Sequence, residues 1–296
     1  MSGGIAVTGA GGMLGQAVVA AARDASHDVL VLTRAEVDLR DADAVRDAVA
    51  EAAAAGFDRF VNCAAYTDVD GAETHEADAL AVNGTAAAHL AEATAAAGAH
   101  LVHVSTDYVF DGTKPTAYVE SDPVDPQSAY GRTKLAGERA VMAAAAGHAV
   151  VRTAWLFGAG GPNFVDTMLR LATDRDEISV VTDQVGCPTW TGHLAPVLVE
   201  IAARRQAGIQ HAAGAGACSW NDLAAATFAQ AGVACRVLPT TTDHFPRPAP
   251  RPAFSVLGSE RDDHLALPPW TEGLNGHLVA AKVIPPSTSL PIGDHA

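Results

Sequence analysis

The alternation of short apolar runs with helical stretches over residues 1–155 constrains the fold more than any other feature. Runs rich in β-branched residues lie at 5–9, 28–33, 57–65, 100–106 and 148–155. Helical patterns lie between them at 12–24, 41–55, 77–98 and 129–146. Apolar strands that alternate with helices are typical of a parallel sheet covered on both faces. We therefore predict an α/β fold with a doubly wound parallel sheet and a ligand site at the carboxyl ends of its strands.

The second half of the chain is less regular. Its patterns predict helices at 163–174, 191–205 and 219–231 and a strand at 178–183. The proline-rich segment 240–257 is expected to be an extended loop, since proline disfavours helix there. These elements predict a smaller C-terminal α/β region.

Composition excludes several classes of protein. The formal charge of −15 argues against broad contact with nucleic acid, which requires clustered Lys and Arg. The sequence has no basic leader followed by an apolar segment and no run of about 18 apolar residues, so we expect a cytoplasmic protein without membrane contact. The four cysteines form no C-x-x-C pair and are expected to be reduced thiols.

A glycine-rich turn, "TGAGGMLG", follows the first strand and opens the first helix. Gly9, Gly12 and Gly15 have the spacing G-x-x-G-x-x-G. Glycines let the backbone approach a pyrophosphate, and the helix N-terminus supplies amide donors. The turn predicts a bound dinucleotide, although such turns also occur for packing alone.

The end of the second strand indicates which dinucleotide binds. An acidic residue there accepts hydrogen bonds from the NAD ribose, whereas a basic residue accommodates the NADP 2′-phosphate. The segment "LTRAEVDL" places Thr33 and Arg34 there, so NADPH is favoured and NADH is not excluded. A solvated Arg34 is the alternative, and Asp38 is expected near the adenine. At the end of the third strand, Asn62 is either a site residue or a structural amide, as is the later Asn83.

Tyr130 and Lys134, in "QSAYGRTKLAGE", lie four residues apart and so share one helical face. The fourth strand ends in "STDY", which places Thr106 opposite that face. The three residues suit protonation of a carbonyl oxygen as a hydride reaches its carbon. A neighbouring ammonium and an oxidised nicotinamide are expected to lower the pKa of Tyr130 from its usual value near 10. Tyr130 would then be the general acid; the alternative is a packed Tyr beside an exposed Lys.

These motifs resemble those of the extended short-chain dehydrogenase/reductases and, within them, the dTDP-4-dehydrorhamnose reductase family, of actinobacterial type. The resemblance rests on "IAVTGAGGMLGQ", "VNCAAYTDVDGAE", "STDYVFDG", "YGRTKLAGE", "VRTAWLFG", "TDQVGCPTW" and "RPAPRPAFSVL". It implies reduction of the C4 ketone of dTDP-4-dehydro-6-deoxy-L-mannose to dTDP-L-rhamnose by NADPH. It also implies a Rossmann-like NAD(P)-binding domain at 1–155, a mainly substrate-binding region at 156–280 partly interleaved with it, and a disordered tail at 281–296.

The resemblance also implies roles for individual residues. The catalytic set is Thr106, Tyr130 and Lys134. The expected substrate contacts are Thr106, Asp107, Tyr108 and Trp155, with Asn163 and Gln184 as weaker candidates that could equally order loops. The expected cofactor contacts are Gly9, Gly12, Met13, Leu14, Arg34, Asp38, Leu39, Ala65, Tyr66, Thr67, Tyr130 and Lys134.

One position departs from the family pattern. Members that dimerise through a magnesium ion carry a glutamate two residues beyond the third glycine, where this chain has Ala17. We therefore expect no metal and a monomer. The alternative functions are reduction of another dTDP-4-keto-deoxysugar, and a non-catalytic NADP-binding regulatory subunit like that of methionine adenosyltransferase. The intact Thr106, Tyr130 and Lys134 speak against the second.

Overall fold

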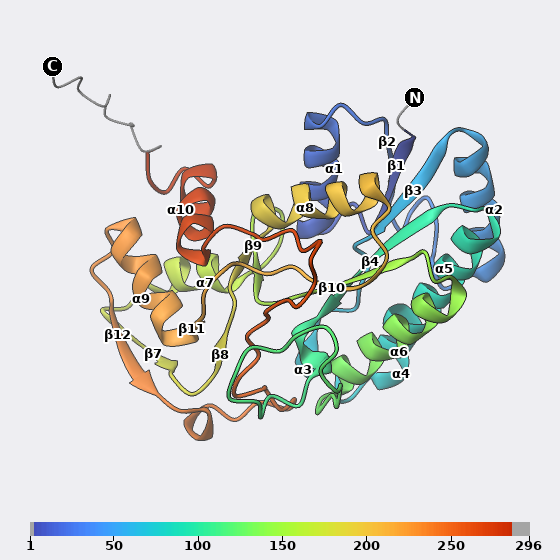
Figure 1. Cartoon of the computed structure of the whole chain (residues 1–296). Helices are drawn as coiled ribbons and strands as arrows, with labels where there is room; N and C mark the ends of the chain where they lie inside the picture. Colours follow the sequence, from blue (N-terminus) through green and yellow to red (C-terminus); the bar gives the residue numbers. More distant parts are fainter. Residues whose placement is uncertain (1–2, 286–296) are drawn as a thin grey trace, which may run out of the picture.

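A six-stranded parallel sheet forms the centre of the molecule. The computed structural model describes residues 3–285, and Figure 1 shows helices on both sides of this sheet. The strands are, in spatial order, β10 (Gly208–His211), β5 (Ala149–Thr153), β4 (His100–Thr106), β3 (Phe57–Asn62), β1 (Gly4–Thr8) and β2 (Val29–Leu32). Every neighbouring pair is parallel. The order reverses between β1 and β3, which is where a doubly wound sheet binds its ligand, so the predicted fold class is confirmed.

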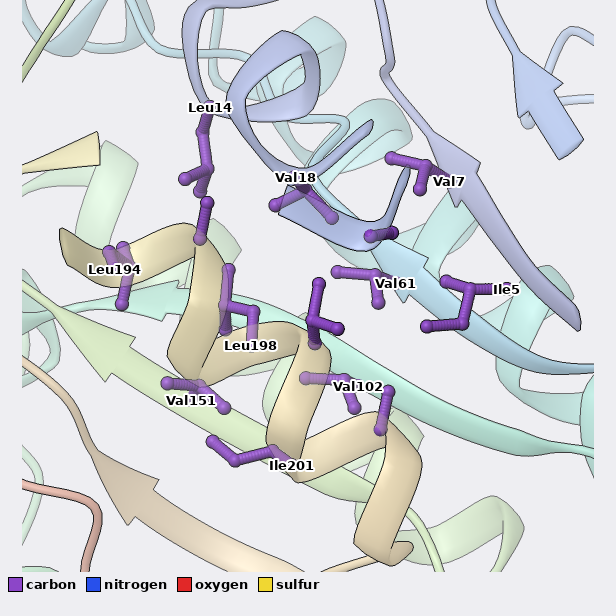
Figure 2. Close-up of a cluster of buried hydrophobic side chains, with 14 of the residues drawn as sticks. Ile5, Val7, Leu14, Val18, Val61, Val102, Val151, Leu194, Leu198 and Ile201 are labelled. Atoms are coloured by element: carbon purple, nitrogen blue, oxygen red, sulfur yellow. The ribbon is translucent and has the colours of Figure 1, made fainter. Parts of the chain in front are cut away.

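The helices bury both faces of the sheet, which explains why the strands are apolar throughout. On one face lie α1 (Met13–Asp24) and α8 (Thr191–Arg204), and on the other α2 (Ala42–Ala54), α5 (Ala86–Ala96) and α6 (Ala129–Ala144). Figure 2 shows α8 lying across the strands, with Leu198 and Ile201 directed at Val102 and Val151. Because these side chains leave water completely or nearly so, each contributes about 1.5–3 kcal/mol to folding.

The predicted helix at 77–98 is wrong as one continuous element. The chain forms α4 (Glu76–Leu80), a π-helical turn η1 (Ala81–Thr85) and then α5. Asn83 lies in the π turn and is fully buried. Its Oδ1 accepts from the Tyr66 amide at 2.8 Å, and its Nδ2 donates to Thr133 Oγ1 at 3.1 Å. Asn83 is therefore a structural amide, and these bonds accompany a local widening of the helix. The short α3 (Val69–Ala72) precedes this segment.

The residues after 155 build a second, smaller α/β region. A parallel pair, β7 (Glu177–Val181) and β12 (Arg236–Thr240), packs with α7 (Phe164–Leu171), α9 (Trp220–Ala231) and α10 (Trp270–Ala280). Two short pairs join it: β6 (Leu156–Phe157) with β9 (Thr189–Trp190), and β8 (Val185–Gly186) with β11 (Cys218–Ser219).

The two regions are interleaved, since α8 and β10 return to the first sheet after residue 190. The division of the chain into domains at 155 stays a prediction. The segment 240–257 is extended apart from one 3₁₀ turn, η3 (Thr242–His244). Of the predicted tail, residues 286–296 lie outside the described residues. None of the helices within 3–285 combines the length and apolar character that a membrane span needs. All four cysteines are free thiols, as predicted.

Candidate active site

The glycine turn between β1 and α1 lies close to its neighbours. Gly9 has φ +67°, and a Cβ there would lie 2.4 Å from the Ala64 nitrogen. A Cβ on Gly15 would lie 2.2 Å from the Gly9 carbonyl oxygen, so only glycine lets α1 begin this close to the strand. Gly12 is the N-cap of α1, is exposed, and offers no side chain to cap the helix. The first-turn amides therefore remain available to an anion such as a pyrophosphate.

Two adjoining cavities open at the carboxyl ends of the strands. The larger, about 620 Å³, lies against the ends of β4 and β5 and the residues after 155. The smaller, about 360 Å³, lies beyond the glycine turn beside the end of β2. Gly12, Cys63 and Ala65 line both, so the two form one extended site of a shape that suits a dinucleotide. Between them, the cavities are lined by every predicted cofactor contact: Gly9, Gly12, Met13, Leu14, Arg34, Asp38, Leu39, Ala65, Tyr66, Thr67, Tyr130 and Lys134.

The smaller cavity carries two guanidinium groups, of which only one was predicted. Arg34 is exposed at the end of β2, and Arg40 lies nearby and is paired with Asp38 at 2.6 Å. The Arg40 guanidinium beside Asp38 holds the pKa of that carboxyl well below its usual range. Glu36 folds back and accepts from the Thr33 amide at 2.8 Å, a turn-closing contact that does not line the cavity. Arg40 was missed because its position depends on the turn after β2.

Thr106, Tyr130 and Lys134 all line the larger cavity. Ser128 caps α6 by accepting from the Gly131 amide at 3.1 Å, which places Tyr130 in the first turn of that helix. Lys134 follows one turn later, and its side chain is only 2% exposed. Its Nζ donates to the Val104 carbonyl of β4 at 2.7 Å. Thr106, the last residue of β4, is 6% exposed, so the structure brings the predicted catalytic set together and rules out the alternative with an exposed lysine.

The expected lowering of the Tyr130 pKa is not found. Burial raises the pKa of Tyr130 to about 12, against the opposing effect of the Thr106 hydroxyl. Burial likewise lowers the pKa of Lys134 to about 8, although the Glu138 carboxylate acts in the other direction. Desolvation dominates both shifts because both groups are enclosed by protein. In this state Tyr130 is a protonated phenol at neutral pH, the form that a proton donor requires.

A buried ion pair fixes α6 against the sheet. Arg152 of β5 donates to Glu138 of α6, with Nη2 to Oε2 at 2.7 Å and Nε to Oε1 at 3.0 Å. Ser105 of β4 donates to the same carboxylate at 2.6 Å. Glu138 lies one helical turn beyond Lys134, and both partners of the pair are almost completely buried. A pair so buried is costly to break, because removing one partner leaves an uncompensated charge.

Asp107 and Tyr108 also lie where the substrate is expected. Asp107 is 1% exposed, and burial raises the pKa of its carboxyl to about 6. Its Oδ1 accepts from Thr106 Oγ1 at 3.0 Å, whereas its Oδ2 has no hydrogen-bond partner among the described residues. Tyr108 packs edge-on against Tyr130, with ring centroids 5.6 Å apart. The hydroxyls of Ser255 and Thr106 oppose the rise in the pKa of Asp107, and Asp107 lines the larger cavity.

Trp155 also lines the larger cavity, and so does Trp220, which no sequence motif indicates. Trp155 has φ +48° and stacks on Trp220, with ring centroids 3.5 Å apart and planes inclined by 4°. The Trp220 indole N–H donates to Gln184 Oε1 at 3.1 Å. Trp220 is 65 residues downstream and begins α9, so only tertiary structure reveals the pair.

The two weaker candidates order loops and do not line the cavities. Asn163 caps α7 by accepting from the Asp166 amide at 2.9 Å and donates to the Gly158 carbonyl at 2.9 Å. Gln184 holds Trp220, as described, and donates to Thr242 Oγ1 at 2.9 Å. They support the walls of the site indirectly, through the Gly158–Gly161 loop and Trp220. Ala17 lies on α1 outside both cavities, and no cluster of three or more His, Cys, Asp or Glu suited to a metal occurs within residues 3–285.

Comparison with known proteins gives a consistent family. Residues 3–282 match the family described as RmlD substrate binding domain. The chain is 47% identical over 283 residues to the dTDP-4-dehydrorhamnose reductase of Mycolicibacterium smegmatis, covering 93% of this chain and 85% of that protein. It is 42% identical over 278 residues to the dTDP-4-keto-6-deoxy-D-glucose reductase of Streptomyces niveus, covering 90% and 94%.

A solved structure supports the same assignment. The dTDP-4-dehydrorhamnose reductase of Bacillus anthracis, in complex with NADP, superposes with a TM-score of 0.91 at 35% identity and covers 95% of this chain and 100% of that one. The match to the family spans nearly all of the described residues and includes both regions of the fold. The chain therefore belongs to the RmlD family of dTDP-4-dehydrorhamnose reductases, as its motifs predict.

Proposed function

We propose that the protein reduces the C4 ketone of dTDP-4-dehydro-6-deoxy-L-mannose to dTDP-L-rhamnose with NADPH. One observation carries this proposal: Thr106, Tyr130 and Lys134 converge on a cavity that continues past the glycine turn to Arg34. A carbonyl reductase needs a proton donor where the hydride arrives. The family membership supplies the substrate class, because the relatives are named for it.

Tyr130 is the proton donor in this mechanism. Its phenol stays protonated at neutral pH because burial raises its pKa to about 12, so it has a proton to give to the ketone oxygen. Thr106 Oγ1, which now donates to Asp107 at 3.0 Å, is placed to turn towards the same oxygen. A positioned acid of this kind contributes roughly 10²–10⁴ to the rate.

Lys134 stabilises the phenolate that remains after proton transfer and holds the nicotinamide ribose. Its ammonium lies one helical turn below Tyr130 and is anchored by the Val104 carbonyl. Because both groups are enclosed, the attraction between ammonium and phenolate is screened less than it would be in water. Lys134 therefore matters most after the phenol has lost its proton.

NADPH fits the extended site. The open amides at Gly12, Met13 and Leu14 would hold the pyrophosphate, and Arg34 with Arg40 would face the 2′-phosphate. When bound, the cofactor supplies the hydride. The carboxylate of Asp38 is already paired with Arg40, so it is less available to accept a hydrogen bond from the ribose hydroxyls.

The substrate sugar would lie between two walls. Asp107 would accept from a sugar hydroxyl, and Tyr108 would contact the same ring. The stacked Trp155 and Trp220 form the opposite side. We further propose a cytoplasmic monomer that needs no metal, since Ala17 offers no ligand for a metal-bridged dimer.

Reduction of another dTDP-4-keto-deoxysugar is the second candidate. It is favoured by the 42% identity to the Streptomyces niveus protein, which is named for a different keto-sugar. Thr106, Tyr130 and Lys134 would serve both substrates. Discrimination between the two keto-sugars therefore depends on the side of the cavity that is built by residues after 155. The non-catalytic regulatory role is less well supported, because the three catalytic side chains are present and converge.

The test is NADPH oxidation at 340 nm with dTDP-4-dehydro-6-deoxy-D-glucose in the presence and absence of a C3,C5-epimerase. We expect oxidation that depends on the epimerase and gives dTDP-L-rhamnose, identified by NMR. Oxidation of equal rate without the epimerase would favour the second candidate. If the protein bound NADPH but oxidised it with no keto-sugar, the result would favour the non-catalytic regulatory role.

A further inference from the structure

His103 is a buried titratable residue that the mechanism above does not use. It lies in β4 three residues before Thr106 and is fully buried. Its Nε2 lies 3.5 Å from Lys134 Nζ, and its Nδ1 lies 3.0 Å from Asn62 Nδ2. Burial, followed by the Lys134 charge, holds the pKa of His103 well below its usual value, so the ring is neutral. A neutral imidazole carries its hydrogen on only one of these nitrogens.

The neighbours of Asn62 determine which nitrogen that is. Asn62 Oδ1 lies 3.0 Å from the backbone nitrogen of Ala64, which can only donate, and 2.8 Å from Thr8 Oγ1. The oxygen of the amide must therefore face Ala64 and Thr8, which leaves Nδ2 to face His103. Because Nδ2 can only donate, His103 Nδ1 is the acceptor. The hydrogen of His103 is consequently on Nε2 and is directed at Lys134.

An N–H directed at an ammonium is unfavourable, whereas an N–H directed at a neutral amine is a hydrogen bond. We propose that His103 is a positioning residue whose Nε2–H favours the neutral amine of Lys134 and so makes its ammonium a readier proton donor to the Tyr130 phenolate. Tyr130 gives its proton to the ketone oxygen. The Lys134 ammonium then gives a proton to the resulting phenolate and becomes a neutral amine. The lone pair left on Lys134 Nζ then accepts from His103. This inference rests on the proposed function for its catalytic consequence only.

The other polar groups that face Lys134 do not favour its neutral amine. Glu138, on the next turn of α6, and the Cys63 thiol, after β3, both favour the ammonium. Tyr130, on the preceding turn of α6, is a neutral phenol in this state. The Val104 carbonyl accepts a hydrogen from either form of Lys134. Burial lowers the pKa of Lys134, and of the polar groups in contact with Lys134 in the described part of the chain, His103 is the one that directs an N–H at its nitrogen.

The tautomer is tested on the wild-type protein, without substrate. Two-bond ¹H–¹⁵N correlation spectra distinguish the two neutral forms of a histidine, and His103→Met identifies the signal. We expect the Nε2–H form from pH 6 to 9. The Nδ1–H form, or an imidazolium, would overturn the proposal whatever the enzyme reduces. This measurement does not require any variant to be active.

The effect on Lys134 is tested by titration. The sequence contains only three lysines, Lys114, Lys134 and Lys282, so protein labelled with [¹³Cε]lysine gives three resolvable signals. His103→Met should raise the midpoint of Lys134 by about one pH unit, a tenfold change in proton affinity, and leave Lys114 and Lys282 unchanged.

The matched control is His100→Met, which removes another buried histidine of β4 whose Nδ1 bonds the Gly147 carbonyl at 2.8 Å. We expect it to leave the Lys134 midpoint unchanged. An unchanged midpoint in folded His103→Met, or an equal shift in both variants, would overturn the proposal. If His103→Met does not fold, His103→Gln identifies the signal in its place, and the tautomer of the wild type still decides. With a keto-sugar substrate, His103→Met should also shift the alkaline limb of the pH dependence of kcat to higher pH. A purely structural role of His103 would not cause this shift.

Discussion

The two walls of the larger cavity are built in different ways. The wall carrying Thr106, Tyr130 and Lys134 is formed by β4 and α6 and is held by the buried Glu138–Arg152 pair. The opposite wall is formed by Trp155 and the start of α9, in a region of short strands and loops. This difference suggests that the first wall fixes the chemistry and the second selects the sugar. Chemistry needs side chains held within fractions of an ångström, whereas specificity is altered by changing loops on a constant scaffold.

The largest effect is expected from Lys134→Met on the first wall. Loss of the ammonium removes both the ribose contact and the stabilisation of the phenolate, so kcat/KM should fall by about 10³. The dissociation constant of NADPH, measured by fluorescence titration, should rise as well. Methionine fills the same buried space, and circular dichroism establishes folding. A variant that lost rate but bound NADPH normally would show that Lys134 does not contact the ribose.

Trp220→Ala tests the second wall. The substitution leaves Trp155 without its stacking partner, so KM for the keto-sugar should rise about tenfold while kcat changes little. The control is Trp270→Ala, which removes a partly buried tryptophan that does not line the cavity. Steady-state kinetics of both variants decide the point. A fall in kcat without a change in KM would contradict the division of labour between the walls.

Much of the first wall was predictable from sequence, and little of the second. The fold class, the glycine turn and the set Thr106, Tyr130 and Lys134 depend on local spacing and on the rule that ligands bind at strand ends. Trp220 and Arg40 enter the site through tertiary packing and a turn, which no spacing rule reports. The strand β10 was missed because its four residues, GIQH, include two polar side chains. The structure raises the Tyr130 pKa through burial, which the sequence does not reveal because it does not show how completely the phenol is enclosed.

Arg34→Ala probes the cofactor end, away from both walls. An exposed ion pair contributes up to about 1 kcal/mol, so affinity for NADPH should fall about fivefold. NADH, which lacks the 2′-phosphate, should bind as before. Dissociation constants for the two cofactors provide the measurement, with Arg46→Ala, an exposed change on α2, as control. An equal loss for both cofactors would mean that Arg34 does not recognise the 2′-phosphate.

The smallest effect concerns stability and comes from Asp107. Its folded pKa of about 6 exceeds the unfolded value of about 3.8, so the native state binds more protons between these pH values. The free energy of unfolding contributed by this group therefore falls as pH rises from about 4 to about 6. Asp107→Asn removes this dependence, and its Tm relative to wild type should rise by on the order of a few degrees across that range. A constant difference in Tm between pH 4 and 7 would contradict the raised pKa.

The most direct test of the account is the turnover of Tyr130→Phe with NADPH and epimerised dTDP-4-dehydro-6-deoxyglucose. The substitution removes only the phenolic oxygen, and the ring keeps its edge-on contact with Tyr108. We predict that kcat falls by about 10² or more while the dissociation constant of NADPH stays near that of the wild type. Near-normal turnover in a folded Tyr130→Phe protein would contradict the assignment of Tyr130 as the proton donor.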